Sequence, residues 1–357
     1  MRIGRRVFGV GAVACLFGLA VSGRAEGEDS RLFEATGERL GRVILLAEQA
    51  GESEAEALQD LGFDCLLVQA ARVEDLEEKL AWARRELGAG CVVVSLDGSA
   101  RGLLSTQVDA GDVAGCVLIA PFLDSSWPPP SAKWGPLLLL PREPQATACE
   151  AWVKQARAAG VEAETRSVGG AIDRDNDPLQ KSVRRFVLAH SGLAPRGLPG
   201  VTFVASPNWD VRSKGDTIDT VVVHATVINT MEATQRAFLD DKIRRVSAHY
   251  VVDRDGTIVQ MVDERASAWH AGVSELEGRP GVNDFSVGVE LINLNDGKDP
   301  YPNAQVAALA RIIQDLRSRW SVPDGRIVSH ASIARPVGRK SDPLGFDFER
   351  LYRVLDR

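Results

Sequence analysis

Histidine and cysteine are scarce in this chain, and neither is evenly spread. Only five of its 357 residues are histidine, and four of these lie between residues 224 and 330. All five cysteines lie before residue 150, so the second half can hold neither a disulfide framework nor a cysteine zinc site. Cys65, Cys91 and Cys116 each begin an apolar run, where a free cysteine behaves as a small buried hydrophobe.

The sequence also lacks an N-terminal apolar run long enough for a clear membrane span. Residues 7–21 are apolar, follow three arginines and end at Ser22. A spanning helix needs about 20 apolar residues, whereas this layout is typical of an export signal. We therefore predict a signal peptide over residues 1–25, cleaved near Ala25, with retention as an uncleaved anchor as the alternative. The paired arginines at positions 5 and 6 also resemble a twin-arginine export signal.

A surplus of basic charge is missing too. Residues 1–25 carry four arginines and no acidic residue, so their removal takes the formal net charge from −7 to −11. An acidic surface repels the phosphates of nucleic acids, and no local basic patch offsets it. The sequence therefore predicts an exported protein, periplasmic or extracellular, with no nucleic-acid partner and no stable membrane span after cleavage. Its oligomeric state is not indicated.

Residues 30–190 alternate between short apolar runs and helical stretches. The apolar runs cover residues 43–47, 65–69, 91–96, 116–120 and 137–140, and the helical stretches cover 54–61, 73–87 and 148–159. Such alternation predicts βαβ units around a mostly parallel sheet. Strands of such a sheet are apolar throughout because helices cover both faces. The fold class of this half is therefore α/β.

The order of these elements resembles an α/β-hydrolase domain, but the nucleophile motif of that family is absent. Residues 92–100 fall where the family places G-x-S-x-G, and this chain has Ser95 and Ser99 around Asp97 instead of flanking glycines. The strained elbow of the family needs those glycines. A histidine is also missing from the expected triad position. We therefore predict a non-catalytic relative, and a hydrolase with Asp97 as its nucleophile is the alternative.

A segment rich in proline and glycine, residues 191–204, is predicted to link this half to a second domain over residues 205–357. In the second domain, one β-branched apolar run leads into His224 and another leads into His330, and Asp342 follows twelve residues later. Two histidines and a carboxylate suffice for a catalytic zinc that keeps a fourth position open. Taken singly, each histidine is more often structural, so spacing alone leaves both interpretations open.

The remaining patterns of the second half predict further elements. Helices are expected over 231–242 and 301–320, a strand over 286–292, and a hairpin of 247–252 and 256–262. Residues 253–256 form the turn of this hairpin and only partly resemble a calcium loop, because the later acidic positions are missing.

Five blocks of the second half together resemble the zinc amidase family that includes phage T7-type lysozymes and peptidoglycan recognition proteins. They are Val-Val-Val-His224-Ala-Thr, Ser247-Ala-His-Tyr-Val-Val-Asp-Arg-Asp-Gly256, Ala268-Trp-His-Ala-Gly-Val273, Val282-Asn-Asp-Phe-Ser-Val-Gly-Val-Glu-Leu291 and Gly338-Arg-Lys-Ser-Asp-Pro343. The resemblance implies a mixed β-sheet flanked by helices, and zinc held by His224, His330 and Asp342. Ser332 departs from the family pattern, which commonly has an aspartate there.

The same resemblance places the remaining catalytic positions on Glu290 and Lys340. Glu290 lies in an apolar strand, where a glutamate is rarely buried without a partner. A desolvated glutamate there can take a proton from the attacking water and pass it to the leaving amine. Lys340 can stabilise the oxygen that gains negative charge. The alternatives are a surface-facing strand residue for Glu290 and a solvated loop residue for Lys340.

Other residues of the matched blocks have two possible roles. Trp269, His270, Asn283 and Asp284 belong to loops that the family uses around its groove, where they can contact sugar or peptide. Packing of those loops is the equal alternative. His249 is expected to be structural and to hydrogen-bond the backbone, rather than to be a metal ligand.

These observations predict an exported N-acetylmuramoyl-L-alanine amidase with one Zn²⁺. Its substrate would be peptidoglycan or muropeptides, cut between the lactyl group of N-acetylmuramic acid and L-alanine. The alternative is a peptidoglycan-binding module without catalysis, which usually lacks one of the metal ligands. The sequence does not indicate whether intact or anhydro-sugar fragments are preferred, or what the first domain binds.

Overall fold

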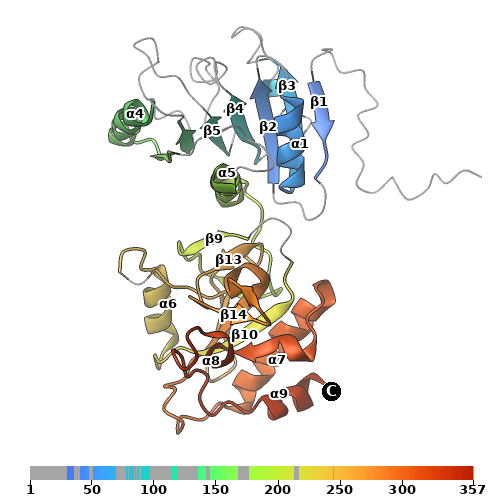
Figure 1. The fold of residues 1–357 in the computed structure, drawn as a ribbon, viewed down its shortest axis with the longest axis vertical. Helices are drawn as coiled ribbons and strands as arrows, with labels where there is room; N and C mark the ends of the chain where they lie inside the picture. Colours follow the sequence, from blue (N-terminus) through green and yellow to red (C-terminus); the bar gives the residue numbers. More distant parts are fainter. Residues whose placement is uncertain are drawn as a thin grey trace, which may run out of the picture.

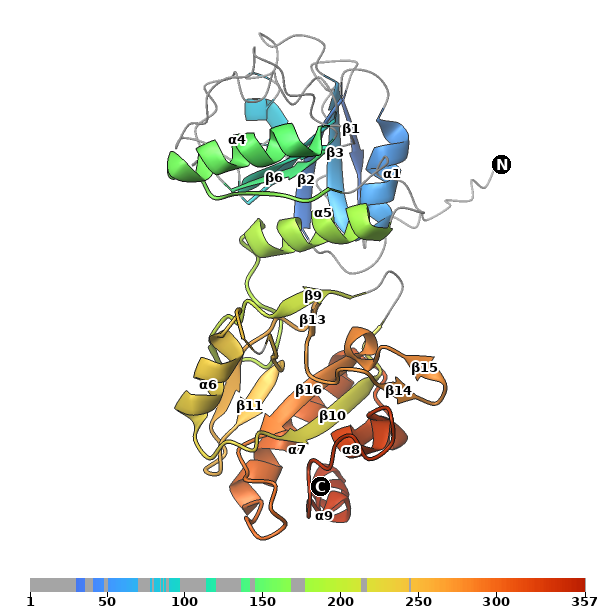
Figure 2. The same ribbon diagram turned by 60° about the vertical axis from the view of Figure 1, so that its left-hand side comes forward.

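The chain folds into two α/β parts, seen one above the other in Figures 1 and 2. The computed structural model describes residues 30–35, 41–47, 51–69, 90–96, 114–119, 136–141, 145–167, 177–212, 217–243 and 245–356, and parts of 78–87. The predicted signal peptide and Asp97 lie outside the described residues. None of the helices described combines the length and apolarity that crossing a bilayer requires.

The first part is a seven-stranded sheet with strand order β1-β3-β2-β4-β5-β6-β7. Its strands are β1 (Ser30–Phe33), β2 (Gly41–Ala47), β3 (Phe63–Gln69), β4 (Val92–Leu96), β5 (Gly115–Ile119), β6 (Leu137–Leu140) and β7 (Ala163–Thr165). Only β1 runs antiparallel to its neighbour, so the predicted mostly parallel sheet is confirmed. The short edge strands β1 and β7 were not predicted, because neither carries a continuous apolar run.

Helices cover both faces of this sheet. They include α1 (Glu52–Asp60), α4 (Ala146–Ala158) and α5 (Asp177–His190). Alternate residues of each strand point to opposite faces, so Ile44 and Leu46 pack with α4, whereas Val43 and Leu45 pack with α1 and α5. The four cysteines described are free and buried, which confirms the prediction for Cys65, Cys91 and Cys116.

The second part is built on a mixed six-stranded sheet of order β17-β10-β16-β11-β12-β8. The strands are β8 (Thr202–Phe203), β10 (Thr220–Ala225), β11 (Tyr250–Val252), β12 (Ile258–Gln260), β16 (Ser286–Leu291) and β17 (Ile327–Ser329). Within it, only β11 and β12 pair antiparallel, and they form the predicted hairpin. This arrangement agrees with the mixed sheet that the sequence implied.

Helices and two small strand pairs surround this sheet. The helices are α6 (Met231–Leu239), α7 (Asn303–Arg319), α8 (His330–Ile333) and α9 (Phe348–Leu355), with 3-10 turns η2 (Val282–Phe285) and η3 (Asp324–Arg326). The strand pairs are β9 (Trp209–Val211) with β13 (Ala266–Ala268), and β14 (Glu275–Leu276) with β15 (Arg279–Pro280). Val221, Val223, Val287 and Val289 pack beneath α7 and α9 on one face. The opposite face is therefore left for the polar residues of β10 and β16.

The segment between the two parts is packed on the second part. Leu198 is buried and its amide donates to the hydroxyl of Tyr250 at 2.8 Å. The amide of Arg196 donates to the carboxylate of Asp263, and its carbonyl accepts from the amide of Glu264. Residues 202 and 203 form β8 at the edge of the sheet. The predicted linker over residues 191–204 is thus held by backbone hydrogen bonds, and the domain boundaries stay predictions.

Candidate metal centre

The centre lies at the carboxyl end of β10, where three neighbouring strands present polar groups. The parallel register pairs His224 of β10 with Glu290 of β16, so both side chains point to the same face of the sheet. On the other side of β10, β17 ends at Ser329 and His330 begins α8. The loop after α8 brings Asp342 back, and its carbonyl accepts from the amide of Ala331 at 2.9 Å.

Three ligand atoms converge in this corner. The Nδ1 atoms of His224 and His330 are 3.0 Å apart, and Asp342 Oδ2 lies 3.3 Å from the first and 3.0 Å from the second. All three residues are buried. A tetrahedral zinc with ligands at about 2.0 Å needs ligand atoms about 3.3 Å from one another. The separations and the N, N, O donor set therefore fit a zinc ion with one position left open.

Hydrogen bonds fix the ring tautomers that such a site needs. Ser286 Oγ donates to the carbonyl of Val282 at 2.6 Å, so it can only accept from His270 Nε2 at 3.2 Å. His270 Nδ1 is then an acceptor for His224 Nε2 at 3.0 Å. His224 Nδ1 is left with a free lone pair that faces the other ligands. The sequence patterns did not single out Ser286, because a small polar residue at the start of a strand carries no distinctive signal.

His330 is held in the equivalent state by the backbone. Its Nε2 lies 3.2 Å from the carbonyl of Ala271, which can only accept a hydrogen bond. The proton of a neutral His330 therefore resides on Nε2, and Nδ1 carries a lone pair toward Asp342. Orientation of a ligand histidine through its second nitrogen is the usual arrangement in metal sites.

The charge states of the ligands suit metal binding at neutral pH. Burial lowers the pKa of His224 to about 4, so its ring is neutral. Two neutral rings and one carboxylate are the protonation states in which these groups coordinate a cation.

Glu290 is the group without a partner at this centre. Its Oε2 is buried and has no hydrogen-bond partner among the described residues. The pKa of Glu290 is raised to about 8, mainly by burial and in addition by the charge of Asp342, while Lys340 opposes both. Lys340 itself is exposed on the loop two residues before Asp342. A buried carboxyl that titrates near neutral pH is suited to accept and return a proton.

The raised pKa of Glu290 predicts a pH-dependent stability of the metal-free protein. Between about 4.5 and about 8 the unfolded chain releases this proton while the folded chain retains it, so stability falls as pH rises. Glu290→Gln is neutral throughout. At pH 8 the free energy of unfolding of this variant should exceed that of the wild type by on the order of a few kcal/mol, so its urea midpoint should be higher. At pH 4 the two midpoints should be similar. Urea titrations in the presence of a chelator measure the unfolding free energy of both proteins at each pH. If the two free energies changed with pH in the same way, the raised pKa of Glu290 would be contradicted.

Among the predicted substrate contacts, His270 contacts the ligand His224, and the contacts of the others hold loops of the second part together. His270 is buried against the sheet because Gly288 has no side chain there, and a Cβ on Gly288 would lie 2.4 Å from the His270 ring. Asn283 Oδ1 accepts from the amides of His270 and Ala271 at 3.3 and 2.8 Å. Asp284 accepts from Ser267 at 3.3 Å. Trp269 is half-buried, with the Arg245 guanidinium 4.8 Å from its ring. Their contact with substrate stays a prediction.

His249 has a structural position, as the sequence predicted. Its Nδ1 accepts from the amide of Gly288 at 3.0 Å, so a neutral ring carries its proton on Nε2, which lies 3.0 Å from the carbonyl of Ala266. Burial lowers the pKa of His249 to about 3. It therefore stays neutral and joins β11, β13 and β16.

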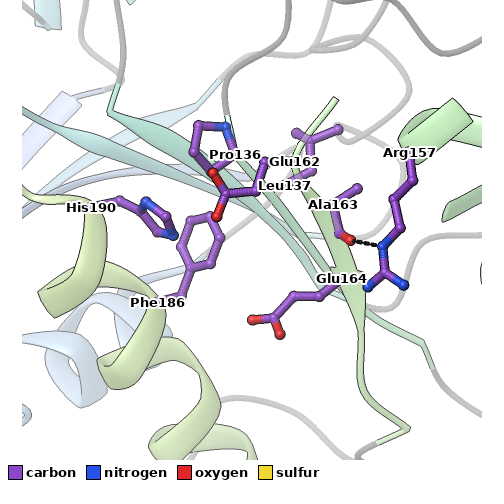
Figure 3. A pocket seen from close by; sticks show the side chains of 8 residues that line it. All are labelled: Pro136, Leu137, Arg157, Glu162, Ala163, Glu164, Phe186 and His190. Carbon is purple, nitrogen blue, oxygen red and sulfur yellow. Dashed lines mark hydrogen bonds between the residues drawn. The ribbon is translucent and has the colours of Figure 1, made fainter. Parts of the chain in front are cut away.

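A cavity of about 360 Å³ also lies in the first part (Figure 3). Its lining consists of Pro136, Leu137, Arg157, Glu162, Ala163, Glu164, Phe186 and His190. It opens at the amino ends of β6 and β7, whereas parallel sheets bind ligands at the carboxyl ends of their strands. Arg157 Nε donates to the carbonyl of Ala163 at 2.6 Å, and the ring of His190 lies 4.5 Å from that of Phe186. The cavity carries no evident catalytic arrangement.

Comparison with known proteins identifies an amidase family in the second part. The family model described as N-acetylmuramoyl-L-alanine amidase matches residues 214–345. The 1,6-anhydro-N-acetylmuramyl-L-alanine amidase AmpD of Escherichia coli is 36% identical over 177 residues, which cover 44% of this chain and 93% of AmpD. AmiD of the same organism is 34% identical over 140 residues, covering 35% of this chain and 49% of AmiD.

Two solved structures of amidases align with part of this chain. A crystal structure of a Se-Met AmpD derivative aligns with a TM-score of 0.38 and 29% identity, covering 46% of this chain and 99% of that one. A complex of E. coli AmiD with the substrate anhydro-N-acetylmuramic acid-L-Ala-D-gamma-Glu-L-Lys aligns with a TM-score of 0.36 and 29% identity, covering 40% and 60%.

Proposed function

The chain belongs to the N-acetylmuramoyl-L-alanine amidase family, and from this premise we propose that residues 205–357 form a zinc-dependent hydrolase of peptidoglycan. The bond cut is the amide between the lactyl group of N-acetylmuramic acid and L-alanine. The main support for a zinc site is the convergence of His224, His330 and Asp342, whose donor atoms lie 3.0 to 3.3 Å apart. The similarity to the 1,6-anhydro-N-acetylmuramyl-L-alanine amidase AmpD supports muropeptides as the substrate class.

The residues of the centre have distinct proposed roles. Zinc, when bound, polarises the amide carbonyl and lowers the pKa of a water molecule toward about 7. Glu290 accepts the proton of the attacking water at its buried carboxylate and returns it to the leaving nitrogen of L-alanine. Lys340 stabilises the carbonyl oxygen as it gains negative charge. Trp269, His270, Asn283 and Asp284 are the residues proposed to contact the sugar or the stem peptide.

The N-terminal residues suggest where the protein acts. We infer export through residues 1–25, by the twin-arginine or the general route, to the periplasm or the cell exterior, where peptidoglycan lies. The first part, residues 30–190, is proposed to be non-catalytic, since its cavity and its parallel sheet show no nucleophile and base together among the described residues.

Zinc content and product analysis test this function together. The purified chain should hold about one zinc by atomic spectroscopy and release free stem peptides from peptidoglycan, detected by mass spectrometry. Removal of zinc by chelation should abolish release, and added zinc should restore it. If the zinc-loaded chain binds peptidoglycan but frees no peptide where a known amidase does, the binding-module alternative is correct.

A further inference from the structure

Helix α5 of the first part has two buried faces. Leu179, Val183 and Val187 recur at helical spacing and pack against the seven-stranded sheet. On the other side, Leu188 packs against the cluster of Val262, Ala266 and Ala268 from the second part. Figure 2 shows α5 lying between the sheet above it and the pair β9 and β13 below it. The helix is thus a direct structural connection between the two parts.

Two arginines of α5 reach into the second part. Arg184 Nη1 donates to the carbonyl of Arg212 at 2.7 Å, and this contact is buried. Arg185 Nη2 donates to the carbonyl of Pro207 at 3.3 Å, and its guanidinium lies 4.4 Å from the centre of the Trp209 ring. Both arginines therefore anchor the interface, but only Arg184 bonds to Arg212.

The side chain of Arg212 gathers several segments of the second part. It is buried, and its guanidinium donates to four carbonyls at 2.9 to 3.1 Å, those of Glu264, Asn283, Asp284 and Ser286. Its Nη2 also packs 3.1 Å from His249 Nε2. A planar group with five donors can hold such a set of carbonyls in one arrangement. Arg212 therefore fixes the turn η2 and the start of β16.

The segment that Arg212 fixes is the one that orients His270. Asn283 binds the amides of His270 and Ala271 through its side chain, and Ser286 binds the ring of His270 at 3.2 Å. His270 in turn accepts from His224 at 3.0 Å. From Arg184 to the ligand His224, each step is a hydrogen bond between buried or half-buried groups.

We propose that Arg212 is a positioning residue of the metal centre and that the first part, through Arg184, holds it in place. This inference rests on the proposed zinc function of His224, His330 and Asp342. It gives the first part a task that does not need catalysis of its own. Groups that orient metal ligands typically contribute 10- to 100-fold to metal affinity.

The test compares three variants of the full chain, two of them at neighbouring positions of α5. Arg184→Met should weaken zinc binding about tenfold in chelator competition. Arg185→Met removes an anchor of the same interface without contacting Arg212, and should stay within about twofold of the wild type. Arg212→Lys keeps the charge but loses the four-carbonyl geometry, so it should weaken zinc at least as much as Arg184→Met. Hydrogen exchange of peptides spanning residues 269–286 should rise in Arg184→Met and not in Arg185→Met.

The outcomes separate this inference from the function on which it rests. If Arg184→Met bound zinc as tightly as the wild type, the inference alone would be overturned. Equal weakening in Arg184→Met and Arg185→Met would also overturn it, because loss of contact between the two parts in general would then explain both results. A wild type that binds no zinc would overturn the proposed function and this inference with it.

Discussion

Glu290→Gln is expected to reduce kcat for stem-peptide release by about 10²- to 10⁴-fold, the usual contribution of a general acid–base group. The substitution keeps the size of the side chain and its place opposite His224 in the sheet. It removes only the capacity to accept and return a proton. Zinc binding should persist, because Glu290 is not among the three converging ligands.

The measurement is single-turnover release of stem peptide, together with zinc content of the same preparation. Glu232→Gln is a matched control, since this exposed glutamate lies in the first turn of α6. It should retain wild-type rates. Activity within threefold of the wild type in Glu290→Gln would remove Glu290 from the mechanism, whereas loss of zinc would show a ligand role instead.

Asp342→Asn is expected to weaken zinc binding by more than about 100-fold, beyond the range for groups that only orient ligands. Burial lowers the pKa of His224 to about 4, and a histidine coordinates a metal through its neutral ring. Asp342 is therefore the one ligand that offers negative charge to a dication in a buried corner. Asparagine keeps the shape but removes that charge.

Chelator competition gives the affinity, and thermal unfolding with and without zinc gives an independent value. Zinc that binds only the folded state raises Tm, and this rise should be lost in Asp342→Asn. Asp241→Asn, at an exposed position after α6, is the control and should keep the full zinc-dependent rise. An undiminished rise in Asp342→Asn would exclude Asp342 as a ligand.

The centre and its surroundings differ in how far sequence could predict them. Apolar runs of β-branched residues predicted β10, β16 and the parallel sheet of the first part, because strands buried on both faces need such composition. Ordered motifs indicated the three ligands and Glu290. These features are local, since a strand and the residue at its end are neighbours along the chain.

The role of His270 could not be predicted from local sequence patterns. From sequence it was equally a substrate contact or a packing residue. The structure buries it between Gly288 and Ser286, with Nδ1 3.0 Å from the ligand His224. This contact joins positions 46 residues apart, and it depends on how β13 and η2 lie over the sheet. No periodicity in the chain encodes that placement.

By itself, the sequence determined the fold class of both halves, the family of the second half and the residues that can bind a metal. The tertiary structure decided which nitrogen of each histidine faces the centre, and how α5 joins the two parts. The physical reason is that apolar periodicity depends on neighbours in the chain, whereas Arg212 bonds to carbonyls 52 to 74 residues away. Every residue has a carbonyl, so only the folded chain shows which of them a buried arginine gathers.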